Sequence, residues 1–250
     1  MNGADPSRWS AVAEGWADLW GTFAEPAWRA ILDATRAGRR RHTRAVRVLD
    51  VGCGSGDFLA YCARLGMVTA GIDPAPGMVG LARRKSADVR LGGAEELPWG
   101  DATFDLVTSF NALQFAEDTD DALAEMIRVT GPGGHVAVAN WAEAARNELD
   151  AVERALDDGP PRPDGDLRLP GGLAELLTDG GLVDVREALA EVPWEVPDDD
   201  ALVRGVLLGE DAGRAGAVLA AARPYRRADG SYRLVNHFRY AAGRRAGGCG

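Results

Sequence analysis

Short apolar runs alternate with segments of helical spacing between residues 46 and 139, and this alternation restricts the fold more than any other feature of the chain. The apolar runs predict buried strands over residues 46–51, 67–72, 89–91, 104–109 and 136–139. Helices are expected between them, over residues 58–65, 76–84 and 121–129. Strands that alternate with helices of this length form right-handed βαβ units on a parallel sheet. The pattern therefore predicts a doubly wound, Rossmann-like α/β domain.

The rest of the chain supplies two further strands and several helical additions. Residues 183–189 and 232–240 are predicted to be strands, which makes a seven-stranded, mostly parallel sheet. Residues 157–172 are rich in Pro, Gly and Asp and predict a loop, and Pro170 suits the first turn of a helix after it. A helical lid insertion is expected at about 191–228.

The N-terminal segment is rich in tryptophan. Aromatic residues recur among small and acidic ones over residues 1–37, a spacing that predicts one or two amphipathic helices. The division expected from these patterns is an N-terminal helical cap over residues 1–44 and a Rossmann-like domain over residues 45–250, which includes the lid.

Composition excludes several classes of partner. The chain has 250 residues, a net charge of -10 and a pI near 4.9, which disfavours nucleic acid and anionic membranes as partners. It has no run of about 18 apolar residues and no signal-like N-terminus, so a cytoplasmic location is expected. Three cysteines without metal-ligand spacing predict neither a disulfide framework nor a metal site. A basic run at residues 36–44 is expected to be a solvated connector. The sequence does not distinguish between a monomer and a homodimer.

The stretch VLDVGCGSGDF joins a predicted strand to a predicted helix through Gly52, Gly54 and Gly56. Asp50 precedes this loop, and Asp73 ends the next strand, where a carboxylate can accept hydrogen bonds from ribose hydroxyls. A dinucleotide fingerprint would place its third glycine at Asp57, and a carboxylate there repels pyrophosphate. The acidic loop therefore favours a cationic cofactor such as S-adenosylmethionine.

The region from Val48 to about Trp141 resembles the class I S-adenosylmethionine-dependent methyltransferases, most closely the small-molecule type related to the ubiquinone-biosynthesis methyltransferases. The resemblance rests on LDVGCGSG, GIDPAPGMVGLAR, GGAEELPWGDATFDLV, SFNALQFAED and VTGPGGHVAVANW, in this order. It implies S-adenosylmethionine as the methyl donor and S-adenosylhomocysteine as the product.

The resemblance also implies a set of cofactor-binding residues. Those beneath the methionine part of the cofactor, or around its amino group, are Asp50, Gly52, Cys53, Gly54 and Gly56. Those for the ribose and adenine are Asp73, Pro74, Met78, Ala94 and Glu95; Gly93 stands where many relatives have an aspartate. Near the sulfonium and the acceptor, the family places Phe110, Asn111 and Gln114, and we expect Trp16 or Trp20 to cover the methionine part.

The catalytic groups are less constrained. Relatives often have His where this chain has Gln114, and an amide positions a substrate but cannot act as a base. His237, in the last predicted strand beside the expected lid, is the candidate base. The expected function is methyl transfer to an O, N or C atom of a small, fairly hydrophobic acceptor, in secondary metabolism. The alternatives are a cofactor-binding protein that promotes a non-methylating cyclisation or rearrangement, and an RNA methyltransferase.

Overall fold

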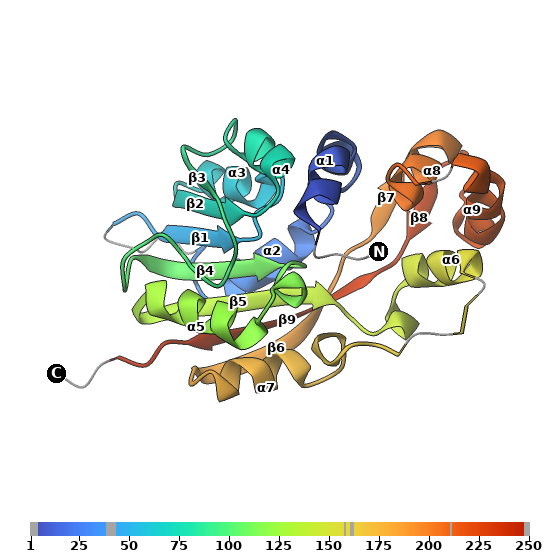
Figure 1. Ribbon diagram of the computed structural model, residues 1–250. Helices are drawn as coiled ribbons and strands as arrows, with labels where there is room; N and C mark the ends of the chain where they lie inside the picture. Colours follow the sequence, from blue (N-terminus) through green and yellow to red (C-terminus); the bar gives the residue numbers. More distant parts are fainter. Residues whose placement is uncertain (1–4, 39–43, 158, 161–162, 211, 248–250) are drawn as a thin grey trace.

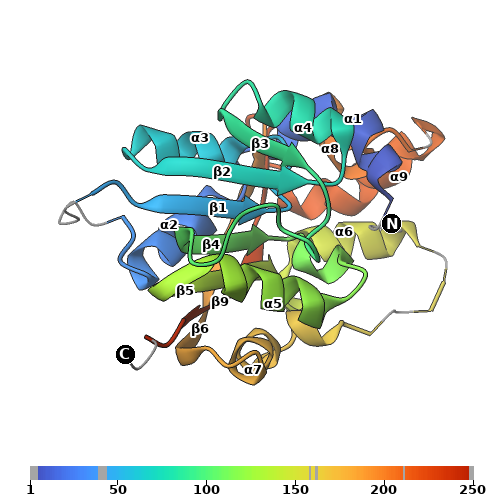
Figure 2. The ribbon, with the colours of Figure 1, turned by 60° about the vertical axis from the view of Figure 1, so that its left-hand side comes forward.

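The central element is a seven-stranded sheet (Figure 2). The computed structural model describes residues 5–38, 44–157, 159–160, 163–210 and 212–247. Across the sheet the strands follow the order β3-β2-β1-β4-β5-β9-β6, and all are parallel except β9, which is antiparallel to both neighbours. Their bounds are β1 (Arg47–Val51), β2 (Val68–Asp73), β3 (Asp88–Leu91), β4 (Phe104–Phe110), β5 (Thr130–Trp141), β6 (Val183–Glu191) and β9 (His237–Arg244).

Helices cover both faces of this sheet and make a three-layer α/β structure (Figure 1). One face packs against α5 (Thr119–Val129) and α7 (Gly172–Asp179). The other packs against α2 (Glu25–Ala34) and α3 (Asp57–Arg64), with α4 (Pro76–Ala82) beside α3. The predicted doubly wound, Rossmann-like fold is confirmed.

A lid stands at one end of the sheet, on the right in Figure 1. It consists of residues 194–234 together with α6 (Glu148–Leu156), a helix that the sequence patterns did not reveal. Residues 194–234 form β7 (Trp194–Val196), α8 (Asp199–Leu207), α9 (Ala215–Ala222) and β8 (Tyr232–Leu234), and β7 pairs with β8. The lid has an apolar core of its own, which includes Val152, Leu202 and Leu234.

The single strand predicted over residues 232–240 is wrong, because the chain changes sheets in the middle of it. Buried Asn236 lies between β8 and β9, where its Oδ1 accepts from Leu149 N at 3.0 Å and its main-chain oxygen accepts from Val192 N at 2.7 Å. These bonds satisfy the backbone at the crossing point. Residues 232–234 therefore belong to the lid, and only β9 belongs to the main sheet.

The two N-terminal helices take different places. In α2, Trp28, Ile31 and Leu32 are buried against the main sheet. The other helix, α1 (Pro6–Trp20), contacts both α4 and α8 and so lies between the body and the lid (Figure 1).

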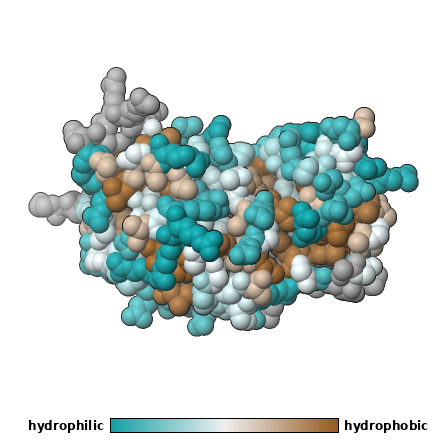
Figure 3. Space-filling view, turned by 90° about the horizontal axis from the view of Figure 1, so that it is seen from above, coloured by the Kyte–Doolittle hydropathy of each residue, from teal (hydrophilic) through white to brown (hydrophobic). Residues whose placement is uncertain are grey.

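The described surface is largely polar on the face shown in Figure 3, with apolar residues in patches between polar ones. Among the described helices, none is both long and apolar enough to cross a membrane.

Candidate active site

The glycine loop between β1 and α3 has a backbone shape that side chains would disturb. Gly52 has a φ of 73°, and a Cβ there would lie 2.2 Å from the Cβ of Ala112. Gly54 has a φ of 51°, but the space beside it is open to 4 Å, so a ligand can approach its backbone. Gly56 has another role: a Cβ there would lie 2.8 Å from Ala82, so this glycine allows α3 and α4 to pack closely.

Two buried carboxylates lie at the carboxyl ends of β1 and β2. Asp50 Oδ1 accepts from Thr108 Oγ1 at 2.7 Å, and burial raises the pKa of Asp50 to about 7 despite this bond. Asp73 accepts from Gly54 N at 2.8 Å and from Ala75 N at 2.9 Å. Burial also raises the pKa of Asp73, while these two backbone bonds oppose the rise. The fold thus holds two poorly solvated acids next to each other.

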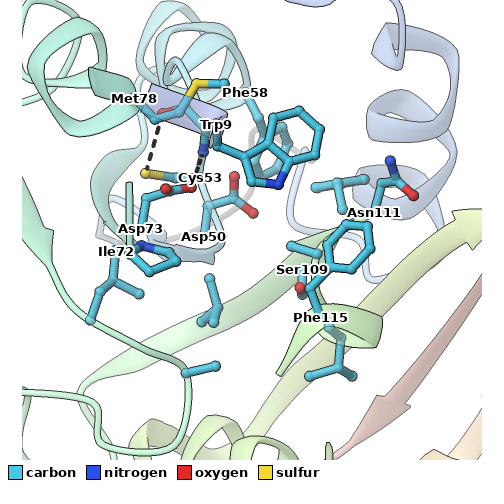
Figure 4. Close-up of a pocket in the computed structure, with 18 of the residues that line it drawn as sticks. Trp9, Asp50, Cys53, Phe58, Ile72, Asp73, Met78, Ser109, Asn111 and Phe115 are labelled. Atoms are coloured by element: carbon cyan, nitrogen blue, oxygen red, sulfur yellow. Dashed lines mark hydrogen bonds between the residues drawn. The ribbon is translucent and has the colours of Figure 1, made fainter. Parts of the chain in front are cut away.

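A cavity of about 290 Å³ opens at this edge of the sheet. Figure 4 shows Asp50 and Asp73 on one side of it and Asn111 and Phe115 on the other. The predicted cofactor residues that line this first cavity are Trp16, Trp20, Asp50, Gly52, Cys53, Gly54, Asp73, Pro74, Met78, Ala94, Glu95, Phe110 and Asn111. Gly56 alone of the predicted set does not line it.

The departure from the family pattern at Gly93 has a structural counterpart. A Cβ on Gly93 would lie 2.7 Å from Oε2 of Glu95, so the Glu95 side chain already fills the space beside residue 93. The other carboxylate oxygen of Glu95 accepts from Glu117 N at 2.7 Å, which fixes the side chain at the rim of the cavity. An acid is therefore still present there, two residues later in the chain.

Three tryptophans of α1 cover the first cavity, and we call Trp9, Trp16 and Trp20 the aromatic roof. Trp9 and Trp16 meet edge to face at 5.1 Å, and the rings of Trp16 and Trp20 stack at 5.8 Å. Phe115, from the short helix η1 (Leu113–Phe115), approaches Trp9 at 6.4 Å. Trp9 and Phe115 were not predicted as lining residues, although the tryptophan spacing that predicted the helix includes Trp9.

The first cavity fits the chemistry of S-adenosylmethionine. Ser109 and Trp28 line it, and within the described structure the Oγ of Ser109 and the Nε1 of Trp28 are buried without a hydrogen-bond partner. The Asp50 and Asp73 carboxylates suit a cation and a ribose. Asp57, at the N-terminus of α3, lies 2.8 Å from Lys85 Nζ and keeps an acid where a pyrophosphate would bind.

The two catalytic candidates lie apart from each other. Gln114 Nε2 donates to Asn111 Oδ1 at 2.9 Å, and Asn111 has a φ of 51° at the end of β4. His237 lines neither of the two cavities that we describe. Its Nδ1 lies 3.0 Å from the main-chain oxygen of Arg146, because β9 starts beside the segment that joins β5 to α6. The structure therefore does not bring His237 to the site as a base.

A second cavity of about 320 Å³ lies under the lid, on the other side of the aromatic roof. It shares the three roof tryptophans, Asn111, Phe115 and Trp141 with the first cavity. Its remaining polar lining is Gln114, Asn140, Asp150, Glu153 and Arg168, and none of these except Gln114 was predicted. They come from η1, β5, α6 and the short helix η3 (Asp166–Arg168), which only the tertiary structure brings together.

A metal site and the basic run at residues 36–44 are the two remaining binding features considered from the sequence. Among the described residues, no group of three His, Cys, Asp or Glu side chains could hold a metal ion. Residues 39–43, most of the basic run on which the RNA alternative depends, lie outside the described residues.

The sequence of this region is similar to that of known methyltransferases. Residues 49–138 match the family model described as a methyltransferase domain. Malonyl-[acyl-carrier protein] O-methyltransferase of Yersinia pestis is 37% identical over 120 residues, which are 47% of this chain and 45% of that protein. Demethylmenaquinone methyltransferase of Renibacterium salmoninarum is 40% identical over 115 residues, 43% of this chain and 48% of that one. The chain spans about half the length of these curated relatives.

Solved structures share the fold over most of the chain. The YcgJ protein from Bacillus subtilis has a TM-score of 0.59 at 19% identity and covers 88% of this chain and 98% of its own. A structure named the [4+2]-cyclase SpnF has a TM-score of 0.52 at 20% identity, over 88% of this chain and 83% of its own. At such identities the likeness establishes the architecture and nothing about the reaction.

Proposed function

We propose that this chain, which carries a class I S-adenosylmethionine-dependent methyltransferase domain, transfers a methyl group to a small, fairly hydrophobic acceptor in secondary metabolism. The observation that carries this proposal is the first cavity, where two buried acids at the ends of β1 and β2 face an aromatic roof. Acids suit the sulfonium and ammonium of the cofactor, and the roof excludes water from the methyl group.

Each part of the cofactor has partners among the lining residues. Asp73 would hold the ribose hydroxyls while it keeps its bonds to Gly54 N and Ala75 N, because an ionised carboxylate has about four acceptor sites. Asp50 would face the amino group. Pro74 and Met78 would contact the adenine, and Ala94 and Glu95 would lie at its edge.

The bound cofactor supplies a methyl group on a positively charged sulfur, and the protein has to position the acceptor and exclude water. Such positioning can lower the barrier by about 7–11 kcal/mol. Phe110 and Asn111 border the first cavity, and Gln114 fixes the Asn111 amide from the second. We assign Asn111 and Gln114 to substrate positioning.

A non-methylating reaction is the second candidate, since no described histidine lines either cavity. A related fold is named a [4+2]-cyclase, but this likeness concerns architecture only. Product mass separates the two readings, because only a methyltransferase adds one methyl group to the acceptor and releases S-adenosylhomocysteine.

The first test is ligand-dependent melting. S-adenosylmethionine or S-adenosylhomocysteine at about 100 times its Kd should add roughly 2.7 kcal/mol to the free energy of unfolding. At about 2–4 °C per kcal/mol, the Tm should rise by roughly 5–10 °C. NAD at the same concentration should leave the Tm unchanged. Equal melting curves with and without millimolar S-adenosylhomocysteine would reject the proposed function.

A further inference from the structure

The second cavity has an acidic lining. Its ionisable residues are Asp150 and Glu153 on α6 and Arg168 on η3, two acids against one base. The rest of the lining is aromatic, aliphatic or amide. A ligand in this cavity therefore meets more negative than positive charge.

Arg168 is already occupied by protein groups. Its Nη2 and Nη1 donate to the two oxygens of Asp150 at 2.6 and 3.2 Å. Its Nε and Nη2 also donate to the main-chain oxygen of Ala142, at 2.9 and 2.8 Å, and its Nε lies 3.3 Å from Asp164. The planar fork that would bind a ligand carboxylate is thus bound to Asp150.

Glu153 is in the opposite situation. Within the described structure, neither of its carboxylate oxygens has a hydrogen-bond or ion-pair partner. Its side chain is exposed and lines the second cavity. A carboxylate in this position is available to a ligand.

Desolvation is the main cause that raises the pKa of Glu153, to about 7, and the charge of Asp150 adds to it. Positive groups, Arg168 on η3 among them, oppose the rise, whereas Glu210, which follows α8 and pairs with Arg8 of α1, adds to it. A carboxyl group with such a pKa can accept and release a proton near neutral pH.

We propose that the second cavity is the acceptor site of the methyl transfer and that Glu153 is its catalytic base, taking the proton of an uncharged hydroxyl compound. The inference rests on the proposed function. The first and second cavities meet at the aromatic roof, Asn111, Phe115 and Trp141, so an acceptor under the lid lies beside the cofactor cavity. A free carboxylate is disfavoured as the acceptor group, because it would meet Asp150 and Glu153 and find Arg168 occupied.

The step balances with these groups alone. The hydroxyl oxygen uses a lone pair to form the bond to the methyl carbon as the carbon–sulfur bond breaks, and that bond's electron pair stays on sulfur. The O–H bond breaks, its electron pair remains on oxygen, and the proton passes to a Glu153 oxygen. The products are a methyl ether and S-adenosylhomocysteine. A hydroxyl group suits this base because it keeps lone pairs while it carries its proton, whereas an ammonium group has none.

Binding of a matched pair of probes tests the inference. Naphthol and naphthoate share one ring system and differ in the group presented to Glu153. We expect calorimetric titration of the S-adenosylhomocysteine-loaded protein at pH 8 to show naphthol binding at least tenfold more tightly than naphthoate. The affinity for naphthol should rise several-fold from pH 6 to pH 8 as Glu153 ionises. Loss of one charge-assisted hydrogen bond in Glu153→Gln should weaken naphthol binding about tenfold at pH 8 and remove the pH dependence.

Three controls separate a catalytic base from a structural residue. Glu153→Asp keeps the charge and should keep the pH dependence. Glu175→Gln makes the same charge change at an exposed position of α7 and should bind naphthol like the unaltered protein. S-adenosylhomocysteine should bind equally to all three variants, because Glu153 does not line the first cavity.

Several results would overturn the inference. These are naphthol affinity that does not change in Glu153→Gln, naphthoate binding as tight as naphthol binding, or no binding of either probe to the cofactor-loaded protein. If the unaltered protein does not bind S-adenosylhomocysteine, the proposed function itself fails. If it binds the cofactor product but does not prefer naphthol, only the assignment of Glu153 and the second cavity fails.

Discussion

Individual residues at the first cavity have structural roles beside the binding roles that we propose for them. Asp73 shows this most clearly: it is 7% exposed, and its two oxygens hold the glycine loop and the turn after β2 through Gly54 N and Ala75 N. A strand-end acid of this kind can be read as a turn cap or as a ribose ligand. The geometry supports both readings at once, because the cap leaves acceptor sites unused.

We predict that Asp73→Ala lowers both cofactor affinity and the Tm of the ligand-free protein. Affinity should fall at least tenfold, because a charge-assisted hydrogen bond contributes roughly 1.5–3 kcal/mol. The ligand-free protein should lose about 1–3 kcal/mol, since the N–H groups of Gly54 and Ala75 lose their acceptor. Asp73→Asn keeps one acceptor oxygen and should restore part of the stability but not the affinity. Calorimetry and melting curves measure the two effects.

Asp88, an aspartate in the neighbouring strand β3, provides a control for these variants. Asp88 starts β3, does not line the first cavity, and bonds to Arg90 and Trp99. Asp88→Asn should change the Tm without changing cofactor affinity. Cofactor binding that is equally tight in Asp73→Ala, Asp73→Asn and the unaltered protein would remove Asp73 from the binding site.

Among the elements, α1 is the one that connects the body to the lid. It packs on α4 at Gly77, where a Cβ would lie 2.6 Å from the main-chain oxygen of Ser10. On its other side Trp20 stacks on Trp194 of β7 at 4.2 Å. The Trp20 indole donates to Gly205 O of α8, and the Trp194 indole donates to Leu19 O of α1. The helix therefore covers the cavities and also forms part of the lid core.

Replacing Trp20 with Ala should destabilise this connection. A buried Trp→Ala change costs about 3–5 kcal/mol, and Trp20 is 5% exposed. We expect a Tm loss of at least about 6 °C, together with faster proteolysis within the lid. Trp16→Ala is the comparison, because Trp16 is only partly buried. It should lower the Tm less than Trp20→Ala does. Its loss of cofactor-binding free energy should be larger than its loss of unfolding free energy. Equal Tm losses in the two variants would contradict this division of roles.

For the whole molecule, one buried cation joins segments that are distant in sequence. Arg239 of β9 donates to Glu187 of β6 at 2.9 Å and to Glu143 at 2.6 Å, and its side chain is 6% exposed. Glu187 also accepts from Gly171 N at 2.9 Å, at the start of α7. Burial alone would raise the pKa of Glu143, but hydrogen bonds from Arg146 and Arg239 outweigh it and lower this pKa to about 2.

We predict that Arg239→Met costs about 1.5–3 kcal/mol of unfolding free energy at neutral pH, because two partly buried acids lose the cation that they share. The pKa of Glu143 is lowered in the folded state, so its contribution is complete above about pH 4.5 and is lost as the pH falls towards 2. Urea unfolding over this pH range should therefore show a smaller acid loss in Glu143→Gln than in the unaltered protein. An identical acid loss would show that the Glu143 carboxylate does not stabilise the fold.

The sequence by itself determined the strands and helices between residues 46 and 139, the glycine loop and the two acids, because these signals lie within a few residues of each other. Periodicity and turn chemistry are local properties. Only the tertiary structure decided that β9 lies between β5 and β6, that the chain leaves the lid sheet at Asn236, and that His237 lines neither of the two cavities. The second cavity is the clearest case: Gln114, Glu153 and Arg168 have no shared local pattern, and long-range packing of the lid on the sheet edge brings them together.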